Sequence, residues 1–75
     1  MFHTIEFRID CTVDLESSPK NRLEKLRIRQ GERRRAQIRP YVVDTALGLT
    51  EVADLFFDDG TATRMVGFWR FSLVD

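Results

Sequence analysis

Residues 2–15 alternate between apolar and polar side chains, and this alternation constrains the fold more than any other feature of the sequence. A period of two places the two sets of side chains on opposite faces of a β-strand, so one face is buried and the other meets water. The apolar set is Ile5, Phe7, Ile9, Cys11, Val13 and Leu15, and the polar set is Thr4, Glu6, Arg8, Asp10, Thr12 and Asp14. We therefore predict a strand over residues 2–15 whose outer face is mainly acidic.

The remainder of the chain also has the pattern of strands joined by turns. Hairpin turns are predicted at residues 30–32 and 58–61, where Gly31 and Gly60 can adopt the positive φ that such turns need. Residues 44–50 indicate a further turn. Pro40 cannot donate a ladder hydrogen bond, so its strand is expected at a sheet edge or at a bulge. The predicted strands cover residues 25–30, 33–43, 52–57, 61–66 and 68–74.

A short helix near residues 18–25 is the expected exception to this pattern. Ser18 followed by Pro19 is a helix-start signal, with serine as the N-cap and proline at the first helical position. The rest indicates an all-β fold, a single domain over residues 1–75. We predict five or six antiparallel strands in a meander that can close into a small barrel, because closing the sheet removes exposed edges.

Composition limits how such a chain can be stabilised. A chain of 75 residues buries a small core, and the usual aids are disulfides, a metal or a partner subunit. Cys11 and His3 are the only residues of their types, so neither an internal disulfide nor a Cys/His zinc site is predicted. No apolar run is long enough for a membrane helix. We expect a cytoplasmic protein without metal or cofactor. Self-association and unusually good packing remain as the means of stabilising its small core.

Catalytic residues are not evident in the sequence. Cys11 belongs to the apolar set of its strand, where a buried thiol is inert, and His3 is expected at a strand end. The carboxylates of Asp54, Asp58 and Asp59 could hold a divalent cation, but we favour a β-turn stabilised by Asp58 and Asp59. Glycine-rich phosphate loops are absent. We therefore expect that the protein is not an enzyme.

Positive charge is concentrated in residues 20–39, which hold nine of the twelve Lys and Arg residues and only two acids. One interpretation is binding of nucleic acid or a nucleotide phosphate, with Tyr41 stacking on a base. The predicted phosphate-binding residues are Arg33, Arg34, Arg35, Arg39 and Tyr41. The interpretation that we favour is cross-strand pairing, because opposite charges on facing strands stabilise a sheet. The expected pairs join Arg27 and Arg29, or Arg35 and Arg39, to Glu6, Asp10 and Asp14.

Two short stretches are similar to patterns of known families. RRRAQIR resembles the RxxxR motif of PilZ domains, small barrels that bind cyclic di-GMP, with Arg35 and Arg39 at the two motif positions. That family's second motif, D/NxSxxG, is not matched, because Ala46 replaces the serine and Gly48 lies one residue too close to Asp44. Residues 42–60 look like the opening hairpin of PRC-barrel domains, over less than a third of the chain. We assign no function from either.

Adjacent aromatic residues in the predicted C-terminal strands point to self-association. In a strand, neighbours face opposite sides, so one member of each pair enters the core and the other needs cover. The pairs are Phe56–Phe57 and Phe68–Trp69. We predict a homo-oligomer through these four residues, with another protein as an alternative partner. The expected function is a self-associating interaction module, and the alternative is phosphate binding through residues 33–39.

Overall fold

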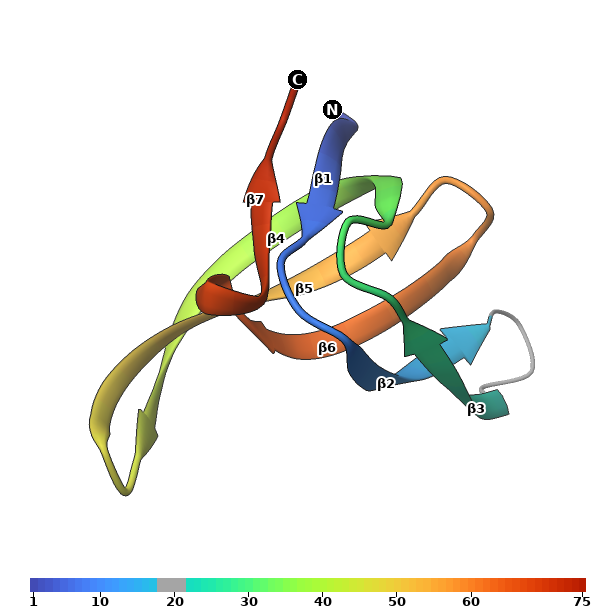
Figure 1. The fold of residues 1–75 in the computed structure, drawn as a ribbon. Helices are drawn as coiled ribbons and strands as arrows, with labels where there is room; N and C mark the ends of the chain where they lie inside the picture. Colours follow the sequence, from blue (N-terminus) through green and yellow to red (C-terminus); the bar gives the residue numbers. More distant parts are fainter. Residues whose placement is uncertain (18–21) are drawn as a thin grey trace.

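The computed structural model describes residues 1–17 and 22–75, which form one sheet of seven antiparallel strands (Figure 1). The sheet order is β3-β2-β6-β5-β4-β1-β7. The strands are β1 (His3–Phe7), β2 (Cys11–Ser17), β3 (Arg22–Ile28), β4 (Arg33–Thr45), β5 (Gly48–Phe57), β6 (Thr61–Gly67) and β7 (Phe71–Leu73). The described residues contain no helix long and apolar enough to cross a membrane. The all-β prediction is confirmed, with more strands than the five or six expected.

The strand predicted over residues 2–15 is divided into β1 and β2, and this division curls the sheet into a half-barrel. β1 pairs with β4, whereas β2 pairs with β6 on the other side of the molecule. At the bend, the Phe7 amide donates to the Glu32 carbonyl and the Arg8 amide donates to the Arg70 carbonyl. Alternation survives on both sides of the bend, because Ile5, Phe7 and Val13 are all buried. The prediction of one unbroken strand was therefore wrong, although the buried face was assigned correctly.

The helix predicted near residues 18–25 is wrong for residues 22–25, which belong to β3. β3 pairs with β2 from Ser17↔Arg22 to Cys11↔Ile28, and Ile28 is fully buried. Pairing with β2 gives the backbone of this segment its hydrogen bonds, whereas a helix of two turns is only marginally stable by itself. Residues 18–21, which carry the Ser-Pro signal, lie outside the described residues.

The last predicted strand, residues 68–74, is shorter than expected. Residues Phe68–Arg70 form a 3₁₀ turn, η1, and only Phe71–Leu73 form strand β7. The turn folds Trp69 back over Gly67, where a Cβ atom would lie 2.4 Å from the indole nitrogen. The missing side chain of Gly67 therefore leaves the space that the turn requires.

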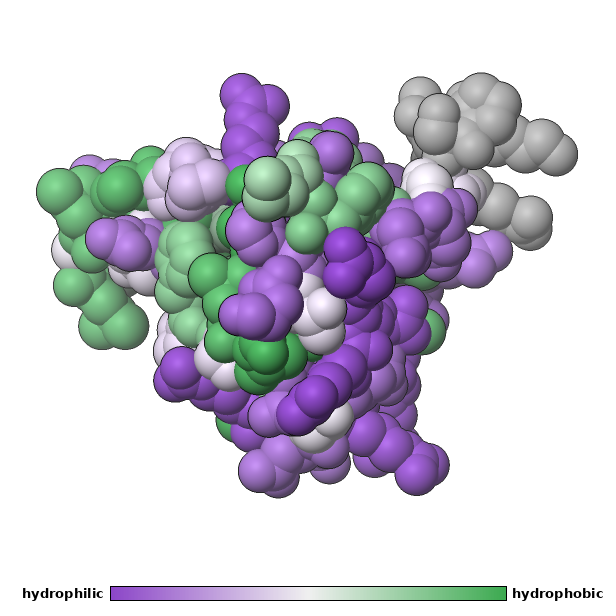
Figure 2. All heavy atoms as spheres, turned by 90° about the horizontal axis from the view of Figure 1, so that it is seen from above, coloured by the Kyte–Doolittle hydropathy of each residue, from purple (hydrophilic) through white to green (hydrophobic). Residues whose placement is uncertain are grey.

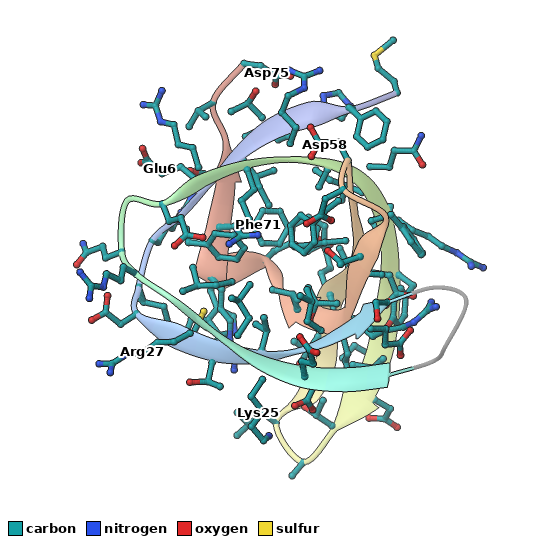
Figure 3. All side chains as sticks on the ribbon, turned by 90° about the vertical axis from the view of Figure 1, so that its right-hand side faces the viewer. Glu6, Lys25, Arg27, Asp58, Phe71 and Asp75 are labelled. Carbon is teal, nitrogen blue, oxygen red and sulfur yellow. The ribbon has the colours of Figure 1, made fainter. Side chains whose placement is uncertain are left out.

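The core lies inside the curled sheet, where the inner faces of the strands meet. Figure 3 looks into this interior, with Phe71 at the centre and Lys25 and Arg27 directed outward. The apolar residues of the core cluster are Ile5, Phe7, Val13, Ile28, Ala36, Ala53, Leu55, Phe57, Val66 and Phe71. This interior takes its members from every strand, so each of them contributes to one shared core.

One hairpin is longer than the barrel that it belongs to. β4 pairs with β5 from Ala36↔Phe57 to Thr45↔Gly48, but it pairs with β1 only as far as Ala36. The far end of the hairpin therefore projects from the body (Figure 1). Its turn consists of Ala46 and Leu47, so the turn predicted over residues 44–50 is mostly strand. We call the projecting segment, residues 41–52, the arm.

Candidate interaction surfaces

The basic residues at the start of β4 lie beside β1 and are largely paired. Arg33 donates from Nε to Glu6 Oε1 at 3.0 Å. This is a cross-strand pair of the expected kind, but it is formed by a different arginine from those expected. Arg34 donates from Nε to Glu32 Oε2 at 2.6 Å. The Arg34 guanidinium also lies 5.5 Å from the centre of the Phe57 ring. Both side chains therefore have protein partners of their own.

The other predicted phosphate-binding residues do not converge with these two. Arg35 donates to Thr4 Oγ1 at 3.3 Å and to the Phe2 carbonyl at 3.5 Å. Arg39 is exposed and forms neither a hydrogen bond nor an ion pair with the described residues. Tyr41 faces the outer side of the sheet and donates its hydroxyl to Asp54. The predicted group is therefore spread along β4 and does not enclose a single site.

Asp54 organises a polar network on the outer face that the sequence did not reveal. Its Oδ1 accepts from the Tyr41 hydroxyl at 2.8 Å and from the Met65 amide at 3.1 Å. Its Oδ2 accepts from Arg64 at 3.1 Å, and Arg64 also donates to Glu16 at 3.2 Å. The pairing of β5 and β6 shifts beside Asp54, and Met65 there has a φ of 56°, uncommon for a residue with a side chain. The carboxylate therefore stabilises a β-bulge.

The network changes the acidity of its members. Burial is the largest single influence on Asp54 and would raise its pKa. The hydrogen bonds from Tyr41, Met65 and Arg64 together outweigh burial, so the pKa of Asp54 lies below its ordinary value. Tyr41 donates its hydrogen bond to Asp54 only while its phenol is neutral. This bond is the largest cause of the raised pKa of Tyr41. At neutral pH the pair is thus an ionised carboxylate and a protonated phenol.

The four aromatic residues predicted to mediate self-association have different environments. Phe57 lies in the core, and Phe56 lies on the outer face beneath the Arg64 guanidinium, 5.3 Å from its ring centre. Phe68 packs against the core and against Phe71, with 5.4 Å between ring centres. Trp69 remains 58% exposed. Each pair thus has one member toward the core, but only Trp69 offers a mostly exposed surface.

The remaining candidates from the sequence have local structural contacts. Cys11 is half-buried against the core, and His3 Nδ1 lies 3.4 Å from Asp75 Oδ2. Asp59 accepts from the Thr61 amide at 2.9 Å and from its hydroxyl, and these bonds hold the pKa of Asp59 below its ordinary value. Across residues 1–17 and 22–75, no group of three or more His, Cys, Asp or Glu residues is arranged to hold a metal ion.

The arm carries the two most exposed apolar side chains of any strand or turn within the described residues, and a third that is more than half exposed. Leu47 at its tip is 97% exposed, Leu49 is 78% exposed and Val42 is 55% exposed. Figure 2 shows the arm as a lobe at the left in which apolar surface predominates. Asp44 and Glu51 are also exposed on the arm and form no ion pair with the described residues. This surface is not used by the chain's own fold.

An open groove of about 650 Å³ lies where the arm joins the body. β4 contributes Ile38 and Pro40 to its lining, and Phe68 and Leu73 contribute from the C-terminal segment. Arg39 and His3 also line it and are its basic groups. Beyond Ala36, the edge of β4 facing away from β5 pairs with no strand among the described residues, and the groove runs beside that edge.

Neither the arm nor the groove was predicted from the sequence. The arm has the same apolar and polar alternation as the buried part of the hairpin, so periodicity alone does not distinguish them. The available signal was the absence of any Lys or Arg between Arg39 and Arg64, which gives the arm a uniform negative charge. In comparisons with models of protein families, with curated proteins and with solved structures, no match to this chain was found.

Proposed function

We propose that this protein is a self-associating interaction module that acts by binding and not by catalysis. The observation that carries the proposal is the arm, which projects from the body and exposes Val42, Leu47 and Leu49. Clustered exposed apolar side chains are typical of interaction surfaces, because leaving them in water is unfavourable. A small core gives a further reason, since burial between subunits stabilises a short chain.

The contacts within the body support the same assignment. Arg33 and Arg34 are engaged by Glu6 and Glu32, so the basic segment stabilises the sheet and is less available to an external anion. Of the four arginines predicted to bind phosphate, Arg35 and Arg39 keep guanidinium groups without a carboxylate partner among the described residues. Phosphate binding through this segment is therefore the less supported alternative. Cytoplasmic location remains an expectation that rests on the single, unpaired cysteine.

Light scattering across a concentration series tests self-association. We expect the mass to rise from that of a monomer to a defined oligomer as the protein reaches high micromolar concentration, because mass action favours the bound state. A strictly monomeric protein over the whole range would contradict the proposal. Retention of labelled single-stranded DNA or RNA at low salt, lost at high salt, would favour the phosphate alternative.

A further inference from the structure

The arm presents two apolar and two acidic residues in a checkerboard on one face. Val42 lies opposite Glu51, and Asp44 lies opposite Leu49, so each acid neighbours an apolar side chain across the hairpin. Directly opposed residues of an antiparallel pair share a face of the sheet. Together with Leu47 at the tip, these residues form an apolar surface with a negative border. A surface of this kind fits a groove that is apolar inside and basic at its rim.

The groove at the base of the arm has this chemistry. Ile38, Pro40, Phe68 and Leu73 give it apolar walls, and Arg39 stands at it without an ion-pair partner among the described residues. His3 adds a ring nitrogen, although its Nδ1 already lies 3.4 Å from Asp75. The arm is negative and the groove has an unpaired guanidinium, so their charges are complementary.

The molecule's own arm is badly placed to fill its own groove. Ile38 and Pro40 in the groove belong to β4, and β4 itself continues into the arm, which leads away from the body (Figure 1). A second copy of the chain does not have this restriction. Because arm and groove adjoin, two copies related by a two-fold axis can each offer an arm to the other's groove, which closes the assembly at a dimer.

We propose that two copies of this chain form such a reciprocal clasp, in which the arm of each copy lies in the groove of the other. Leu47 and Leu49 contact the apolar walls, and Asp44 and Glu51 face Arg39 of the partner copy. This inference rests on the proposed self-association and adds which surfaces meet. It also gives Arg39 a role that is distinct from binding phosphate.

A charge-swap experiment tests the clasp. The arm-reversed variant carries Asp44→Lys and Glu51→Lys, and the groove-reversed variant carries Arg39→Glu. Each variant alone places like charges together, so we expect its dimer dissociation constant to rise at least about tenfold in sedimentation equilibrium. When the two variants are mixed, both contacts are complementary again. Native mass spectrometry should then detect the mixed dimer well above the statistical share of one half.

The controls separate a folding defect from a lost contact. Circular dichroism checks each fold, and because Arg39 lies opposite Asp54 in the β4–β5 register, His3→Glu serves as a second groove-reversed variant. Asp58→Lys and Arg27→Glu reverse exposed charges on other elements and should leave dimerisation unchanged. Variants that dimerise like the original chain, or mixtures without enrichment of the mixed dimer, would overturn the clasp and leave self-association intact. A chain that is monomeric before any substitution would overturn both proposals.

Discussion

The two ends of the β4–β5 hairpin have the same antiparallel pairing and opposite environments. At the body end, Ala36 pairs with Phe57 and both are buried. At the arm end, Asp44 pairs with Leu49 and both are exposed. The difference arises from the other strands, because β1 accompanies β4 only as far as Ala36. Strand formation is therefore a property of the hairpin, whereas burial depends on what the rest of the chain brings to each face.

The largest effect should come from removing a core side chain of the body. We expect Phe7→Ala to lower the free energy of unfolding by about 3–5 kcal/mol, since Phe7 is fully buried and its loss leaves a cavity. Urea denaturation measures the change. Leu49→Ala on the arm is the matched control and should shift the midpoint little when the protein is dilute enough to be monomeric. Equal losses at the two positions would contradict the division between body and arm.

The next largest effect should come from the polar network on the outer face. Asp54→Ala removes the acceptor shared by Tyr41, Met65 and Arg64, and we expect a loss of about 2 kcal/mol in the free energy of unfolding. Thermal unfolding followed by circular dichroism measures it. Asp58→Ala, at an exposed turn position, is the control. A loss below about 0.5 kcal/mol would mean that the bulge holds without the carboxylate.

The same network predicts a pH dependence. The pKa of Asp54 is lower in the folded protein, so its contribution is fully present above the ordinary carboxyl pKa of about 4 and declines as the pH falls through the folded value. The stability difference between the original chain and Asp54→Asn should therefore shrink in acid. Denaturation curves of both proteins at about pH 7, 4 and 3 measure this stability difference above and below the ordinary carboxyl pKa. A difference that stays constant would show that Asp54 does not act through its charge.

A smaller effect is expected for the ion pair between β1 and β4. Glu6 and Arg33 are partly exposed, so a double-mutant cycle with alanine should give a coupling of about 0.2–1 kcal/mol that weakens with added salt. Unfolding in low and high sodium chloride measures both quantities. The control is the same cycle on Thr12 and Arg27, which lie opposite each other in β2 and β3. These two residues cannot form an ion pair, because threonine is uncharged. If the coupling energy is absent at low salt, Glu6 does not hold Arg33, and Arg33 is again a candidate for binding an anion.

The smallest effect on folding, and the sharpest on association, should come from the arm tip. We expect Leu47→Ser to change the free energy of unfolding of the monomer by less than about 0.5 kcal/mol, because Leu47 is almost fully exposed. The same substitution should weaken dimerisation at least about tenfold, since it removes an apolar contact. Denaturation of the dilute, monomeric protein measures the change in stability, and sedimentation equilibrium measures the change in dimerisation. A stability loss in the monomer would show that the tip packs on its own body.

Sequence reasoning predicted those parts of the fold that depend on local geometry. Gly31 and Gly60 both have a φ of 88°, as the predicted turns required. Gly60 joins the paired strands β5 and β6, but the hairpin predicted at Gly31 is wrong, because β3 and β4 do not pair with each other. The buried face of the N-terminal segment also followed from alternation. The bend between β1 and β2 did not, because Ile9 continues the alternation through it. That bend depends on pairing with β4 and β6, strands that lie far along the chain.

The candidate surfaces were harder to predict for the same reason. Val42 and Leu49 have the same pattern as Ile38 and Leu55, and only the missing neighbour strand makes them exposed. Arg34 lies on the same side of β4 as Ala36, and its guanidinium lies over the Phe57 ring. Trp69 was assigned to a strand because Trp69, Phe71 and Leu73 alternate with other residues over positions 68–74. The turn that places Trp69 over Gly67 depends on the space left by the missing side chain of Gly67, which the alternation does not indicate.

The pairing of the first strand with the last strand has a consequence for folding kinetics. Ile5 pairs with Leu73, so this part of the wall forms only when the two ends of the chain meet, at a large cost in loop-closure entropy. Thr45 and Gly48, in contrast, meet across a two-residue turn. We expect the β4–β5 hairpin to form early and β1–β7 pairing to form late, with overall folding in the millisecond-to-second range of non-local β-proteins. The arm, which is part of that hairpin, would then form before the body has finished folding.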